Sequence, residues 1–183
     1  CLGIFAATLL NHALAGAFGM LVAQWLPPQA LQWLVGLSFR FWMHGQRSGD
    51  IRSWERTWSL YCGMFGPMRA KLAVGALSNW VGALGTASQR EIEISAGQCS
   101  TFCRDECLAI SMIAACQHRT CPAMRACAFA LIESGHIDAQ KIDEVATPAQ
   151  SFADTLSSLD QVLSQSSIMA APRDFAAANW LPS

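Results

Sequence analysis

The stretch that decides the expected fold is Leu2–Phe39, LGIFAATLLNHALAGAFGMLVAQWLPPQALQWLVGLSF, which contains no aspartate, glutamate, lysine or arginine. Its first part, Leu2–Leu26, is 25 residues long and almost entirely apolar or small. A helix of this length, at about 1.5 Å per residue, exceeds the ~30 Å hydrocarbon core of a bilayer. It also lacks the polar face of a helix at a protein surface. The sequence therefore predicts a membrane span over Leu2–Leu26.

A second apolar segment, Ala30–Met43, follows a turn at Pro27 and Pro28. Proline ends one helix and is well tolerated at the start of the next. The segment is only 14 residues long and contains Arg40, which is costly inside a membrane. We expect residues 1–43 to form a transmembrane helical hairpin. The composition agrees, because only 14% of the residues are charged and the mean hydropathy is +0.28.

The predicted first span carries two kinds of candidate residue. Asn11 and His12 lie near its middle, where polar side chains either line a transport path or form hydrogen bonds between helices. Ala15 and Gly19 are small residues four apart, a spacing that allows another helix to pack closely. The transport-path candidates are therefore Asn11 and His12, and the helix-packing candidates are Ala15 and Gly19.

The same region resembles a known family. Gly3–Gly16 (GIFAATLLNHALAG) is similar to the second transmembrane helix of the GDT family of calcium/manganese:proton antiporters, which includes the MneA-type manganese exporters. Trp25–Phe39 resembles that family's next loop and third helix, so the resemblance covers residues 2–43. It implies a fragment of a divalent cation:proton antiporter, in a multi-pass membrane protein of a bacterial inner membrane.

The family's cation site lies in two Glu-x-Gly-Asp-Lys-Thr/Ser motifs, and neither occurs here. The resemblance therefore implies that this chain binds no manganese, calcium or cofactor by itself and is not an enzyme. Its expected partners are the lipid bilayer and either the missing helices of the same transporter or further copies of the chain. The chain starts at Cys1 rather than Met, which indicates truncation upstream or, alternatively, a processed lipoprotein.

Resemblance and composition both change near residue 40, either because of a frameshift in the coding sequence or because the tail is divergent. Residues 44–71 are expected to be a basic cytoplasmic connector by the positive-inside rule. A phosphate-binding patch is the alternative interpretation. The basic residues concerned are Arg40, Arg47, Arg52, Arg56, Arg69 and Lys71.

Residues 72–134 are expected to be a helical Cys-rich segment, in which Leu72–Ala87 is an interfacial or core helix rather than a span. The spacing of Cys99, Cys103 and Cys107 would place them on one helix face, without mutual disulfides. Thiolates can bind copper or zinc, so the competing function is a Cys-rich helical metal-binding protein with an N-terminal membrane anchor. Buried free cysteines are the alternative. The candidate ligands are Cys99, Cys103, Cys107, Cys116, Cys121 and Cys127.

Residues 135–183 are expected to be a soluble helical or partly disordered tail. A helix can open at Pro148, placing Phe152, Leu156, Leu159 and Leu163 on one face. No nucleophile motif, phosphate loop or paired-carboxylate pattern is evident, and the net charge of −1 argues against nucleic acid. The expected fold class is all-α: a transmembrane hairpin followed by a loosely defined helical, Cys-containing remainder.

Overall fold

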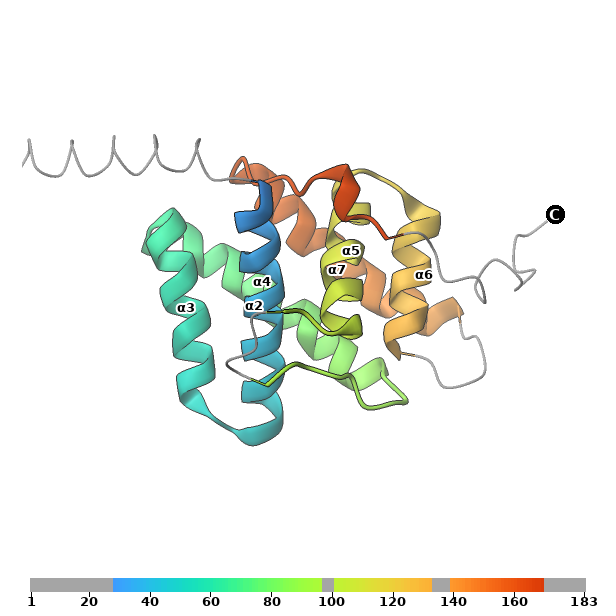
Figure 1. Ribbon diagram of the computed structural model, residues 1–183, viewed down its shortest axis with the longest axis horizontal. Coiled ribbons are helices and arrows are strands. Elements are labelled where there is room, and N and C mark those ends of the chain that lie inside the picture. The colour runs from blue at the N-terminus through green and yellow to red at the C-terminus, as the bar shows by residue number, and fades with distance from the viewer. Residues whose placement is uncertain (1–27, 97–100, 133–138, 170–183) are drawn as a thin grey trace, which may run out of the picture.

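The computed structural model describes residues 28–96, 101–132 and 139–169, and over these ranges it is built of helices alone (Figure 1). This confirms the all-α class. The predicted span Leu2–Leu26 lies outside the described residues. The elements are α2 (Pro28–Ser48), α3 (Ile51–Phe65), α4 (Pro67–Ala87), α5 (Arg104–Gln117), α6 (Cys121–Ile132), α7 (Ala139–Ser158) and a short 3-10 turn, η1 (Gln165–Ser167).

The prediction of a multi-pass membrane antiporter fragment is wrong. Within the described ranges, no helix combines the length and the apolar character needed to cross a bilayer. The predicted second span shows why: Ala30–Met43 belongs to α2, which buries Leu34, Val35 and Phe39 against other helices of the same chain. Its Arg40 is buried among protein groups, not in lipid. The apolar residues of this segment thus form a protein core.

Trp80 joins three helices at the centre of that core. Its side chain is fully buried in α4 and stacks on Phe152 of α7, with ring centroids 5.7 Å apart. Phe39 of α2 lies on another side, at 5.6 Å. Aromatic pairs of this kind contribute about 0.5–1.5 kcal/mol beyond the area they bury. Because Phe39 precedes position 40 and Trp80 and Phe152 follow it, residues on both sides of the change in composition near residue 40 share one core.

Two predictions for later helices have different outcomes. Leu72–Ala87, expected to be an interfacial or core helix and not a span, falls within α4, which buries Leu77 and Leu84 completely, so it is a core helix. The prediction that a helix opens at Pro148 is wrong, because Pro148 lies inside α7. Residues on both sides of it are buried, and their burial offsets the ~3 kcal/mol that an interior proline costs.

Two consecutive carboxylates at the start of α5 hold the segment that connects α4 with α5. Asp105 accepts hydrogen bonds from both terminal nitrogens of Arg90, at 2.8 and 2.7 Å, and from the backbone N–H of Glu93 at 2.7 Å. Arg90 also donates to the carbonyl of Ala130 at the end of α6. Asp105 thereby ties the connecting segment to both α5 and α6.

Glu106 makes the corresponding connection to α2. Arg40 donates from Nε to Oε1 at 2.6 Å and from Nη2 to Oε2 at 3.0 Å, and the two side chains are 2% and 0% exposed. Ser95 adds hydrogen bonds from its backbone N–H (3.0 Å) and hydroxyl (2.9 Å), and Cys103 adds one from its N–H (2.9 Å). A buried charge is tolerated only when it is paired and hydrogen-bonded in this way.

Removing one partner of this pair should destabilise the fold strongly. We expect Arg40→Met or Glu106→Gln to lower the free energy of unfolding by about 3–5 kcal/mol, because the other charge stays buried and unpaired. The double variant should lose clearly less than the sum of the single losses. Urea denaturation of the four proteins measures this coupling. Arg119→Gln is the control, since its pair with Asp154 is exposed and should contribute under about 1 kcal/mol; additive losses at Arg40 and Glu106 would contradict the prediction.

Acid should weaken the same pair. Burial raises the pKa of Glu106, but hydrogen bonds from Arg40, Cys103 and Ser95 outweigh it and hold the pKa below its ordinary 4.5. The stabilisation is therefore complete above pH 4.5 and is lost as the pH falls through the lower folded-state pKa. Urea midpoints between pH ~7 and pH ~3 should fall less steeply for Glu106→Gln than for the parent protein. Parallel curves would show that another group dominates.

Candidate functional site

A small, partly open pocket lies where α2, α3 and the segment after α4 meet. Its volume is about 80 Å³. In Figure 1, α2 and α3 run side by side, and the segment that follows α4 passes the end of α2. The lining residues are Arg40, Phe41, His44, Asp50, Ser53, Arg56, Ile94 and Ser95.

Helical spacing and close packing bring these side chains together. Arg40 and His44 are one turn apart on α2, as Ser53 and Arg56 are on α3, so each helix presents a pair to the same space. Gly45 allows the two helices to approach, because a Cβ there would lie 2.5 Å from Nε1 of Trp54. The pocket is therefore a consequence of how tightly α2 and α3 pack.

Asp50 is the only carboxylate that lines this pocket, and its oxygens are already engaged. Oδ1 accepts the backbone N–H of Arg52 at 3.1 Å, so Asp50 is the N-cap of α3. Oδ2 accepts the hydroxyl proton of Ser53, also at 3.1 Å. The positive end of the α3 dipole further offsets the Asp50 charge. The carboxylate thus repels an incoming anion less than an exposed one would.

The hydrogen bonds around His44 determine its tautomer. Nδ1 lies 3.1 Å from the hydroxyl oxygen of Ser53 and 3.3 Å from that of Ser48. Ser53 gives its proton to Asp50, and Ser48 gives its proton to the carbonyl of His44. Since both hydroxyls act as acceptors towards the ring, Nδ1 carries the hydrogen. Nε2 is then the nitrogen that can meet a ligand.

The order Asp50–Ser53–His44 differs from that of a catalytic triad. In a triad the histidine lies between the acid and the serine and removes the serine's proton. Here the serine lies in the middle, donates to the carboxylate, and is only 2% exposed. This arrangement offers no base for a nucleophile. The three residues thus lack the order of a catalytic triad.

Arg56 carries a positive charge that no other group lining the pocket neutralises. Its guanidinium lies over the ring of Phe41, 5.7 Å from the centroid. Within residues 28–96, 101–132 and 139–169, no carboxylate comes within ion-pair distance of it. Arg40, by contrast, is held by Glu106. Arg56 is therefore the cation best placed to take an anionic ligand.

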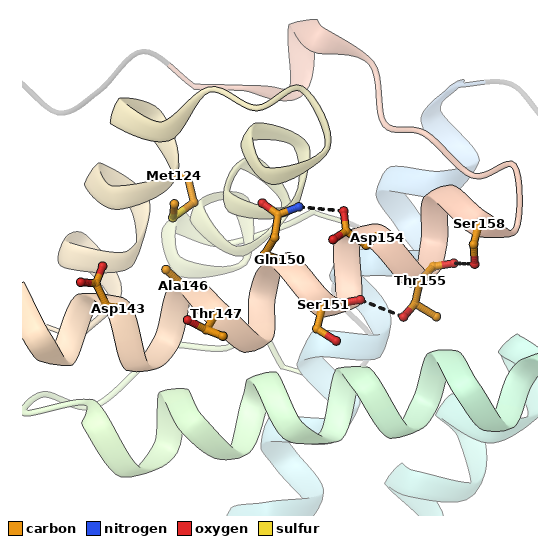
Figure 2. A pocket seen from close by; sticks show the side chains of 9 residues that line it. All are labelled: Met124, Asp143, Ala146, Thr147, Gln150, Ser151, Asp154, Thr155 and Ser158. Carbon is orange, nitrogen blue, oxygen red and sulfur yellow. Dashed lines mark hydrogen bonds between the residues drawn. The ribbon is translucent and has the colours of Figure 1, made fainter.

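A larger depression along α7 is less suited to ligand recognition (Figure 2). It has a volume of about 730 Å³ but is widely open, and its polar groups bond to one another. The hydroxyl of Thr155 donates to the Ser151 carbonyl, and that of Ser158 to the Thr155 carbonyl. Gln150 donates to Asp154 at 2.8 Å. Few donors or acceptors are left for a ligand.

The residues predicted from sequence lie elsewhere or apart. Asn11, His12, Ala15, Gly19 and Cys99 lie outside the described residues. The prediction that Cys103 shares a helix face with Cys107 is wrong, because α5 begins at Arg104 and Cys103 is its N-cap.

The cysteines within the described ranges are separate free thiols. Cys103 and Cys107 lie at the start of α5 and Cys116 near its end, whereas Cys121 and Cys127 are on α6. In this part of the chain no three His, Cys, Asp or Glu side chains gather as a metal site requires. The described thiols thus give no support to the copper or zinc hypothesis.

Sequence reasoning missed His44 and Ser53 and treated Arg40 and Arg56 only as members of a dispersed basic patch. A usable signal exists, because one-turn spacings on both sides of the Gly49-Asp50 turn place these four residues at the same end of a helical hairpin. The pairing of Arg40 with Glu106, which decides which arginine stays available, has no local signature.

The thiols should differ sharply in reactivity. Cys121 is exposed, whereas burial raises the pKa of Cys116 to about 12 and also raises that of Cys127. Because the thiolate is the reactive form, iodoacetamide at pH ~8 should modify Cys121 well before Cys116 and Cys127. Peptide mass spectrometry over time measures this, and addition of urea should remove the difference. Equal rates in the folded protein would contradict the burial of α5 against α6.

No family model, curated protein or solved structure matches this chain. The resemblance of residues 2–43 to the GDT family accordingly stays a prediction.

Proposed function

We propose that this chain is a binding protein for a small tetrahedral oxyanion of the phosphate class, held in the α2–α3 pocket, and that it acts without catalysing a reaction. The observation that carries the proposal is Arg56, an exposed guanidinium at the rim of a partly open pocket, with no carboxylate paired to it among the described residues.

The size of the pocket fits such an ion. A volume of about 80 Å³ is several times the ~10–15 Å³ that one water molecule needs on this measure. One tetrahedral oxyanion fits that space. The guanidinium of Arg56 can donate two parallel hydrogen bonds to such an ion. His44 lines the same pocket.

The surrounding ion pairs support this selectivity. Arg40 and Glu106 neutralise each other, and Asp50 is engaged as the cap of α3. The charge available to a ligand is therefore that of Arg56. A metal cation would meet the positive charge of Arg56 and one carboxylate already in use, so an anion is the favoured occupant.

Calorimetric titration with inorganic phosphate tests the proposal. Two charge-assisted hydrogen bonds, offset by the cost of association, suggest a Kd of about 1 mM. Arg56→Gln should weaken binding about tenfold or more, because it removes the positive charge and the two parallel N–H donors of the guanidinium. Arg69→Gln is the matched control, since Arg69 is exposed on α4 and does not line the pocket. Absence of binding at ~10 mM phosphate, or equal loss in both variants, would refute the proposal.

A further inference from the structure

An open trough adjoins the oxyanion pocket on the outer side of α3. It has a volume of about 650 Å³, and most of its wall is apolar. The residues that line it are Phe41, Arg52, Glu55, Arg56, Ser59 and Leu60. Two of them, Phe41 and Arg56, also line the oxyanion pocket. The two spaces therefore share a wall.

We infer that pocket and trough are two parts of one site for an amphiphilic phosphate monoester, whose head group occupies the pocket and whose apolar chain lies along the trough. This inference rests on the proposed function, because it takes the pocket as the place of the phosphate. The trough adds the class of molecule that carries the phosphate.

The contact of Arg56 with Phe41 lies at the junction of the two parts. The guanidinium is 5.7 Å from the ring centroid, so a cation and an aromatic face stand next to each other. A phosphate monoester has a matching arrangement, because its charged phosphate is bonded directly to an apolar alkyl group. The phosphate can bind Arg56 while the first methylene groups contact the Phe41 ring.

The trough follows α3 for about two turns. Arg52, Glu55, Arg56 and Ser59 are spaced i, i+3, i+4 and i+7, which places them along one side of the helix. Seven residues at about 1.5 Å each give a length of roughly 10 Å, enough for a short alkyl chain. Leu60 packs against the hydrophobic core and supplies apolar floor, and the aliphatic part of the Arg52 side chain can add to it.

Glu55 limits what the far end of the ligand can be. It is an exposed carboxylate that lines the trough, and no described cation forms an ion pair with it. A second negative group on the chain would be repelled there. The site thus favours a ligand with one anionic end and an uncharged chain.

The test compares hexyl phosphate, methyl phosphate and hexanol by calorimetric titration of the full chain. Hexyl phosphate should bind about tenfold or more tightly than methyl phosphate, because its additional methylene groups leave water. Hexanol should bind far more weakly than hexyl phosphate. Arg56→Gln should weaken binding of both phosphates.

Ser59→Trp separates the trough from the pocket. Ser59 is exposed, so a larger side chain there fills the trough without disturbing the core. This variant should bind methyl phosphate as the parent does, but should lose the advantage of hexyl phosphate. Leu72→Trp is the control, since Leu72 is exposed on α4 and outside the trough, and it should keep the advantage.

The outcomes distinguish the two proposals. Equal affinity for methyl and hexyl phosphate would overturn the amphiphile inference and leave oxyanion binding intact. Hexanol binding as tightly as hexyl phosphate would also overturn it, because the alkyl group would then bind without help from the phosphate. Failure of both phosphates to bind would instead refute the proposed function and, with it, this inference.

Discussion

The ion pair between Arg40 and Glu106 is the constraint on which the rest of this structure depends. The two opposite charges are buried, and hydrogen bonds to each other and from Ser95 and Cys103 stabilise them there. Glu106 also holds Ser95 and Cys103, so the same carboxylate positions α2, the start of α5 and the segment between α4 and α5. Arg40 and Ser95 then form part of the pocket wall. The shape of the candidate site follows from this pairing.

The distribution of charge along the chain supports an anionic ligand at α2 and α3. Residues 28–96 contain seven Lys and Arg against four Asp and Glu, whereas the remainder of the chain contains five against nine. The first half thus carries net positive charge although the whole chain is nearly neutral. The part of this positive charge that remains after Arg40 pairs with Glu106 and Arg90 pairs with Asp105 raises the local concentration of anions. It adds to the local effect of Arg56 without specifying a particular ligand.

Local sequence patterns predicted where the helices lie better than they predicted what each helix packs against. Periodicity and apolar character identified α4 as a core helix, and the buried face of α7 at Phe152 and Leu156. The same patterns wrongly predicted a membrane helix at Ala30–Met43. Arg40 can be buried in a protein core because it pairs with Glu106, and that partner lies 66 residues away in the sequence. The prediction at Pro148 was wrong for a related reason. Proline usually starts or ends a helix, but the packing of buried residues on both sides of Pro148 keeps α7 continuous. The pocket forms where α2, α3 and the segment after α4 meet, so it could not be predicted from any one of these segments alone.

The separation of 66 residues between Arg40 and Glu106 also has a consequence for how the protein is made. At about 5–20 residues per second, a ribosome adds Arg40 roughly 3–13 s before it adds Glu106. During that interval Arg40 lacks the Glu106 carboxylate with which it is buried in the finished core. The nascent chain therefore keeps this side of α2 hydrated, and completion of the core waits until α5 has emerged. During translation, the arginine delays the closure of the core that it later helps to hold together.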